Sequence, residues 1–102
     1  MVDLIKWDIY EVTSKRSSLN GVMLRGRIRK LGIHENINVI VENTEDIENG
    51  VRFAVTNGSD AEAIINYLKS IIEDLKIELV LNKTPNPVLS KLKVNIDSRY
   101  TL

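Results

Sequence analysis

The sequence of 102 residues lacks cysteine altogether and contains only one histidine, two prolines, one tryptophan and one phenylalanine. The missing thiols exclude disulfide bonds, a cysteine nucleophile and thiolate metal ligands within this chain. The single histidine, His34, has no serine or carboxylate partner at a recognisable spacing, so we expect a surface residue and not a catalytic base. Aromatic residues make up 5% of the chain, which leaves few rings on which nucleic-acid bases could stack.

An excess of charge of one sign is also missing, because 14 lysines and arginines balance 14 aspartates and glutamates. The chain therefore has no overall electrostatic attraction to nucleic acid, and any basic surface must be local. No apolar run approaches the roughly 18 residues that a membrane-spanning helix needs, and residues 1–10 lack the apolar core of a signal peptide. We expect a cytoplasmic protein with no membrane partner, folded as a single domain over residues 1–102.

Alternating apolar and polar residues predict strands, and apolar residues that recur every three or four positions predict helices. The first pattern occurs at residues 5–10, 37–42, 51–56, 77–81 and 92–96, and the second at residues 21–31 and 59–75. The resulting order is β-α-β-β-α-β, with a short extra C-terminal strand. We therefore predict an α+β fold, a ferredoxin-like βαββαβ sandwich in which two helices cover one face of an antiparallel sheet.

Three local signals predict where these elements begin and end. Ser59 and Glu62 have the spacing of a capping box, which starts the second helix. Gly32 is expected to end the first helix in a left-handed conformation. Asn49-Gly50 predicts a turn between the second and third strands.

Residues 17–25 lead from the first predicted strand into the first predicted helix and read Ser-Ser-Leu-Asn-Gly-Val-Met-Leu-Arg. The backbone N–H groups at a helix start have no intrahelical acceptor, and the helix dipole is positive there, so such a segment suits an anion. Arg25 adds a fixed charge and a planar fork of donors that fits phosphate oxygens. This segment is therefore a candidate phosphate-binding loop.

The same segment resembles the signature of the acylphosphatase family, G-R-V-Q-G-V-G-F-R, in which a phosphate-binding loop precedes an arginine. Three positions match it outright, namely Gly21, Val22 and Arg25. Three others hold related residues where the signature has valine, glutamine and phenylalanine, namely Leu19, Asn20 and Leu24.

The family's second motif, V-x-N with D-G shortly behind it, resembles Val41-Glu42-Asn43 followed by Asp46 and Gly50. Arg25 and Asn43 are 43 − 25 = 18 positions apart, the separation that the family pattern leads us to expect. Two motifs in register are a stronger indication than one. The resemblance extends over the order of elements for nearly the whole chain, which is similar to a single acylphosphatase-like domain.

In acylphosphatases the loop amides and the arginine bind the phosphoryl group of an acyl phosphate, and the asparagine positions the attacking water. The resemblance implies these roles for Arg25 and Asn43, with a phosphate cradle formed by the backbone of Ser18, Leu19, Asn20, Gly21 and Val22. It implies a hydrolase that cleaves the carboxyl-phosphate bond of small acyl phosphates to carboxylate and inorganic phosphate, with no metal and no cofactor. The expected partner is thus a small acyl phosphate or a phosphate anion, and we expect a monomer or weak dimer.

Departures from the family pattern leave a second function open. Ser17 and Ser18 replace a glycine and an arginine, and Met23 replaces another glycine. Three extra residues, 47–49, lengthen the connection behind Asn43. Because glycine alone reaches positive φ without steric cost, these changes bear on the shape of the loop. The alternative function is a catalytically inactive acylphosphatase-like module that binds an anion or a partner.

Local charge leaves a third function open. Residues 15–30 contain no acid and six basic residues, namely Lys15, Arg16, Arg25, Arg27, Arg29 and Lys30. A small RNA-binding domain would use such a surface. Since Phe53 is the only aromatic residue in the central strands, stacking platforms for bases are missing there. A phosphate pocket accounts for the same charges more simply, so nucleic acid is the less favoured partner.

Overall fold

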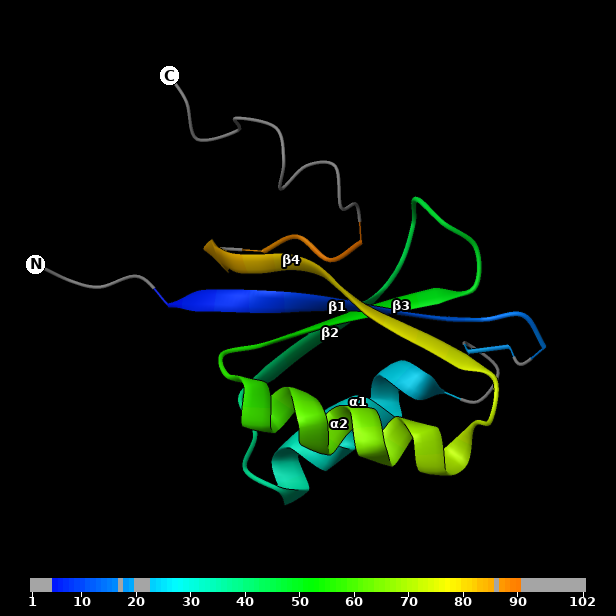
Figure 1. The fold of residues 1–102 in the computed structure, drawn as a ribbon, viewed down its shortest axis with the longest axis horizontal. Helices are drawn as coiled ribbons and strands as arrows, with labels where there is room; N and C mark the ends of the chain where they lie inside the picture. Colours follow the sequence, from blue (N-terminus) through cyan, green and yellow to red (C-terminus); the bar gives the residue numbers. More distant parts are fainter. Residues whose placement is uncertain (1–4, 17, 20–22, 86, 91–102) are drawn as a thin grey trace, which may run out of the picture.

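The computed structural model of the chain describes residues 5–16, 18–19, 23–85 and 87–90. The elements in these ranges are, in chain order, β1 (Lys6–Ser14), α1 (Leu24–His34), β2 (Val39–Asn43), β3 (Gly50–Val55), α2 (Gly58–Ile71) and β4 (Leu75–Pro85). The strands form one twisted sheet, and both helices lie on the same side of it (Figure 1). Within the described ranges, no helix is long and apolar enough to cross a membrane.

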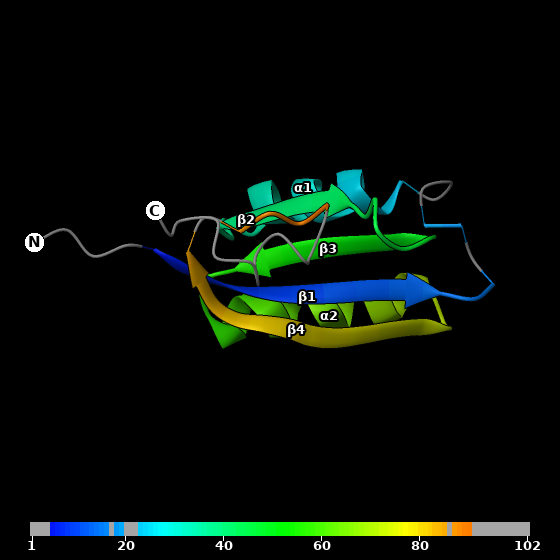
Figure 2. The same ribbon diagram turned by 90° about the horizontal axis from the view of Figure 1, so that it is seen from above.

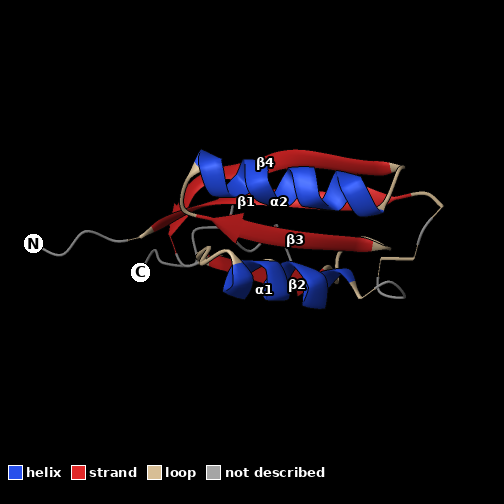
Figure 3. Ribbon diagram, turned by 90° about the horizontal axis from the view of Figure 1, so that it is seen from below, coloured by secondary structure: helices blue, strands red, loops and turns tan. Residues whose placement is uncertain are grey.

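The sheet has the strand order β2-β3-β1-β4, and each neighbouring pair is antiparallel. The strands lie in front of the helices in Figure 2, and the opposite view in Figure 3 shows α1 over β2 and α2 close to β4. The predicted α+β class, with an antiparallel sheet and two helices on one face, is confirmed and is compatible with a ferredoxin-like fold. The extra strand predicted at residues 92–96 lies outside the described residues.

The larger hydrophobic core lies between the sheet and the two helices. Its buried members are Val12, Leu19, Leu24, Ile28, Val41, Val51, Phe53, Val55, Ala61, Ile64, Leu68 and Ile72. Leu24 and Ile28 lie one turn apart on α1, as Ile64 and Leu68 do on α2, so each helix buries one stripe of its surface. Each such side chain contributes about 1.5–3 kcal/mol when fully buried. This packing holds the start of α1 against the sheet.

A second, smaller hydrophobic cluster covers the opposite face of the sheet. Ile9 and Ala54 are fully buried there against Leu89, which belongs to the segment that follows β4. Figure 1 shows this segment, in orange, on the side of the sheet away from the helices. Because successive side chains of a strand point to opposite faces, Ile9 and Val12 of β1 serve different cores. The middle of the sheet is therefore covered on both faces.

Among the described residues, Arg52 of β3 is the only charged residue that is buried, with 1% of its surface exposed. Its Nε and Nη2 donate to Glu11 Oε1 at 2.9 and 2.7 Å. Its Nη1 donates to Asp46 Oδ1 at 2.7 Å and to the Leu89 carbonyl at 3.0 Å. Two carboxylates and a carbonyl thus satisfy the guanidinium, which offsets the cost of removing its charge from water.

The first helix ends three residues later than predicted, at His34 instead of residue 31. α1 continues through Gly32 to His34, and Asn36, with φ of 56°, has the left-handed conformation that was expected at Gly32. The Ile37 N–H donates to the Gly32 carbonyl at 2.8 Å, which gives the helix a Schellman end. A Cβ on Gly32 would lie 2.6 Å from Val39 Cγ1. The glycine therefore permits close packing of α1 on β2 and does not form the turn.

The predicted capping box of Ser59 and Glu62 is also wrong. α2 begins at Gly58, and its N-cap is Asn57, whose Oδ1 accepts the Asp60 N–H at 2.9 Å. Asn57 Nδ2 donates in turn to the Asp60 carboxylate at 3.1 Å. A carboxylate in the first turn also interacts favourably with the helix dipole. The earlier pair, Asn57 and Asp60, therefore starts the helix two residues before the predicted cap.

Candidate functional site

The candidate site lies where the segment before α1 meets the hairpin formed by β2 and β3. Met23 precedes α1 with φ of 57° and ψ of 43°, and no side-chain hydrogen bond caps the helix from this residue. The Leu24 N–H, at the start of the helix, donates to the Leu19 carbonyl at 3.0 Å. Met23 thus has the left-handed backbone at the position where the acylphosphatase signature has glycine. Met23 is 72% exposed and does not belong to the core.

Asn49 connects this segment to the hairpin. Its Oδ1 accepts the Leu19 N–H at 2.8 Å, and its Nδ2 donates to the Ser14 carbonyl at 2.7 Å. The φ of Asn49 is 50°, a conformation that asparagine tolerates better than most residues. One side chain therefore joins the end of β1, the segment before α1 and the hairpin. Asn49 is the last of the three residues by which this connection exceeds the family pattern.

Arg25 and Asn43 line the same pocket, which has a volume of about 560 Å³. Arg25 reaches it from the first turn of α1, and Asn43 from the last residue of β2. The other lining residues are Ile40, Glu42, Glu45, Pro87, Val88, Leu89 and Ser90. Asn43 also lines a smaller cavity of about 200 Å³ with Leu19 and Asn49. The two residues singled out by the sequence motifs are thus brought together, although 18 positions separate them.

A carboxylate lies beside the arginine. Arg25 Nη1 is 3.5 Å from Glu42 Oε2, and Arg29 Nη2 is 3.4 Å from Glu42 Oε1. Arg29 Nη2 also donates to the Val41 carbonyl at 3.4 Å. These distances are long for charge-assisted hydrogen bonds, and the three charged side chains are between 42% and 52% exposed. Exposed pairs of this kind contribute about 0–1 kcal/mol, so a bound oxyanion can compete with Glu42 for Arg25.

The predicted phosphate cradle is described only in part. Ser18 is exposed, whereas Leu19 is buried with 1% of its surface exposed and belongs to the larger core. The Leu19 N–H is already donated to Asn49. Asn20, Gly21 and Val22 lie outside the described residues. Leu19 lines one small cavity with Asn43, and an anion held by the Leu19 amide would have to displace Asn49.

A second polar cluster, around Asp74, fixes the end of β1. Asp74 Oδ2 accepts the Ser14 hydroxyl at 2.8 Å and the Arg16 N–H at 2.9 Å. The Ser14 hydrogen bond, followed by the Arg16 N–H, lowers the pKa of Asp74 below its ordinary value of 3.8. The ionised carboxylate thereby ties the connection before β4 to the start of the segment that leads into α1.

Sequence reasoning missed two residues. One is Asn49, whose side chain joins the segment before α1 to the end of β1. The other is the buried Arg52. Asn49 was visible only as half of a turn signal, and the pattern of β3 shows Arg52 only as one polar position among alternating residues. Both act through partners far away in the chain, which a local pattern cannot reveal. His34, predicted at the surface, has a side chain that is 82% exposed.

In the part of the chain that the structure describes, no group of three or more histidine or acidic side chains is arranged to hold a metal ion. Comparisons of the chain with protein-family models, with curated proteins and with solved structures found no match.

Proposed function

We propose that the chain is an acylphosphatase-type hydrolase, which cleaves small acyl phosphates to a carboxylate and inorganic phosphate. The observation that carries this proposal is that Arg25 and Asn43 line one pocket beside the segment before α1. The resemblance of their two motifs to the acylphosphatase signature supports it independently of the geometry. A cytoplasmic location and a small-molecule partner are parts of the same proposal.

Arg25 would bind the phosphoryl oxygens through its guanidinium, a planar donor fork that remains charged at any physiological pH. Asn43 would hold a water molecule through its side-chain amide. The water oxygen forms a bond to phosphorus, the bond from phosphorus to the carboxyl oxygen breaks, and the carboxylate leaves. A proton from the water goes to the phosphate product. This chemistry depends mainly on positioning and on stabilising charge in the transition state.

Glu42 sets a condition on this mechanism. A dianionic substrate near Glu42 would be repelled, unless the two arginines that flank the carboxylate outweigh it. Arg25 and Arg29 together carry two positive charges, and Glu42 and Glu45, which both line the pocket, carry two negative charges. The substrate must therefore be bound through Arg25 itself, while Arg29 retains Glu42.

The second candidate is an anion-binding module without turnover, and one observation favours it. The Leu19 N–H, which the family resemblance assigns to the phosphate cradle, is occupied by Asn49. A cradle with fewer free donors would stabilise the transition state less, since removing one such donor from an enzyme costs roughly 100- to 1,000-fold in rate. Binding could then persist without catalysis.

The experiment that tests the proposal measures hydrolysis of benzoyl phosphate by the wild type and by Arg25→Ala and Asn43→Ala. Lys69→Ala and Asn66→Ala, both exposed on α2, serve as matched controls. We expect turnover in the wild type and in both controls, and a loss of roughly 100-fold or more in each pocket variant. If the folded wild type shows no turnover above the rate in buffer, the proposed hydrolase activity is excluded.

If the wild type shows no turnover, its affinity for inorganic phosphate tests the second candidate, the anion-binding module. The anion-binding module predicts that phosphate binds to the wild type and not to Arg25→Ala, as measured by calorimetry. Absence of phosphate binding would exclude both candidates for this pocket.

A further inference from the structure

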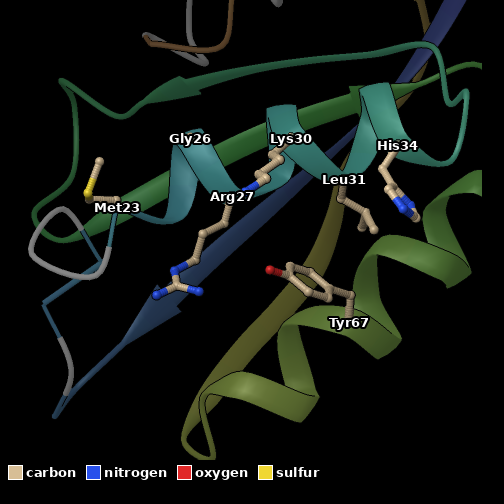
Figure 4. Close-up of a pocket in the computed structure, with 7 residues that line it drawn as sticks. All are labelled: Met23, Gly26, Arg27, Lys30, Leu31, His34 and Tyr67. Carbon is tan, nitrogen blue, oxygen red and sulfur yellow. The ribbon is translucent and has the colours of Figure 1, made fainter.

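A second groove lies between the two helices, on the face of the molecule away from the sheet (Figure 4). Its volume is about 560 Å³, and the described residues that line it are Met23, Gly26, Arg27, Lys30, Leu31, His34 and Tyr67. None of them lines the pocket of Arg25 and Asn43. The volume falls within the roughly 300–1,000 Å³ of typical small-molecule sites.

The helical period divides the basic residues of α1 into two groups. Arg25 and Arg29, one turn apart, lie toward β2 and pair with a carboxylate of that strand. Arg27, Lys30 and His34 follow at spacings of three and four, which places them on the other flank, along the groove. Neither α1 nor the described lining of the groove contains an acidic residue. The groove therefore favours an anion.

The opposite wall supplies an aromatic ring. Tyr67 of α2 is half-buried, and Figure 4 shows its ring and hydroxyl extending into the groove toward Arg27, with Leu31 beside the ring. A tyrosine ring and a guanidinium plane are two surfaces on which a flat aromatic group stacks. Lys30 is a donor suited to phosphate oxygens, whereas His34 Nδ1 lies 3.8 Å from the Glu35 carboxylate. The groove thus combines a stacking surface with a cationic rim.

We propose that this groove binds an aromatic phosphate monoester, the chemical class that includes the nucleoside monophosphates. The ring would lie against Tyr67 and Leu31, and the phosphate would lie toward the cationic side chains of α1. A small ligand of this class matches the volume, the aromatic wall and the positive charge together. This binding does not depend on hydrolysis of acyl phosphates in the other pocket.

The test is calorimetric titration of the full chain with adenosine monophosphate, phenyl phosphate, adenosine and inorganic phosphate. Adenosine monophosphate is expected to bind more tightly than adenosine and inorganic phosphate, because it alone among these three has both the ring and the charge. Phenyl phosphate shows whether the ligand is a nucleotide or a simpler aromatic phosphate. If phenyl phosphate binds more weakly than adenosine monophosphate, the groove is specific for a nucleotide. If the two affinities are equal, a simpler aromatic phosphate is sufficient.

Variants locate the ligand. Lys30→Gln, at an exposed position, is expected to weaken binding roughly tenfold or more through loss of a charged donor. Tyr67→Leu is expected to weaken binding by removing the stacking surface, with its fold checked by circular dichroism. Lys69→Gln, exposed on α2 and outside the groove lining, is the charge-matched control and should bind like the wild type.

Three results would overturn the proposal. The first is no binding of adenosine monophosphate or phenyl phosphate at millimolar concentration. The second is an unchanged affinity in Lys30→Gln. The third is loss of binding in Arg25→Ala, which would place the ligand in the other pocket. If the wild type binds adenosine monophosphate but does not hydrolyse benzoyl phosphate, only the proposed hydrolase activity is contradicted.

Discussion

Replacing Arg52 with alanine is expected to destabilise the fold severely. The guanidinium makes two hydrogen bonds to Glu11, one to Asp46 and one to the Leu89 carbonyl, all at 3.0 Å or less. The Glu11 side chain is only 16% exposed and would lose its buried partner. Removing one member of a buried ion pair costs about 3–5 kcal/mol, and the free energy of unfolding of a whole domain is about 5–15 kcal/mol. We therefore expect a loss of about 3–5 kcal/mol.

Urea denaturation, followed by fluorescence of the single tryptophan, Trp7, measures this change. Trp7 packs on the same cluster as Leu89, so its signal reports the face on which Arg52 lies. Arg29→Ala is the control, because its exposed pair with Glu42 at 3.4 Å contributes about 1 kcal/mol or less. A loss in Arg52→Ala no larger than in Arg29→Ala, with equal denaturant slopes, would refute the structural role assigned to Arg52.

Three further perturbations test separate contacts. Asp74→Ala should lower the melting temperature above pH 4, because the lowered pKa of Asp74 in the folded state stabilises the fold only while the carboxylate is ionised. The difference in melting temperature from the wild type should therefore shrink as the pH falls below 3.8, and a difference that grows with acid would contradict this. Gly32→Ala should destabilise the fold by about 1–3 kcal/mol, because its Cβ would meet Val39 Cγ1 at 2.6 Å. Gly26→Ala, with open space around it, should stabilise the fold by about 0.5–1 kcal/mol. Changes of the same sign in the free energy of unfolding, measured by chemical denaturation, would disprove the packing argument. Asn49→Gly keeps the positive φ but loses two hydrogen bonds of about 0.5–1.5 kcal/mol each, so the Leu19 amide hydrogen should exchange with solvent faster. An unchanged exchange rate would show that the hydrogen bonds of Asn49 do not hold this segment.

The order of the elements could be predicted from the sequence because each strand and helix has its own local apolar period. Their ends could not be predicted as well, because competing signals lie close together. Asn57 and Ser59 both have an acidic residue three positions later, and only the structure shows that Asn57 caps α2. Gly32 looked like a helix end, yet its role is to allow contact with Val39, which lies on the next strand.

The burial of Arg52 could not be predicted, because it depends on residues distant in the chain. An arginine at an alternating position of a strand is ordinarily solvated on the outer face. Here Leu89 and its neighbours cover that face, and Glu11 lies directly opposite Arg52 on β1. No local pattern records that a segment after the last strand returns over the sheet.

Two motifs at a fixed separation predicted roles for Arg25 and Asn43, and both residues line one pocket in the structure. The involvement of Glu42 was not predicted, although it stands inside the second motif. Its side chain faces outward from an edge strand, where it meets the two arginines on the near flank of α1. The groove beside Tyr67 was also missed, because it needs two helices that lie far apart in the sequence.

The most direct test of the proposed hydrolase is hydrolysis of benzoyl phosphate in ¹⁸O-labelled water, with the label located by mass spectrometry. In the proposed mechanism a water held by Asn43 attacks phosphorus, so the wild type should release labelled phosphate and unlabelled benzoate faster than the buffer alone. Label in the benzoate, or release no faster than in buffer, would contradict the account.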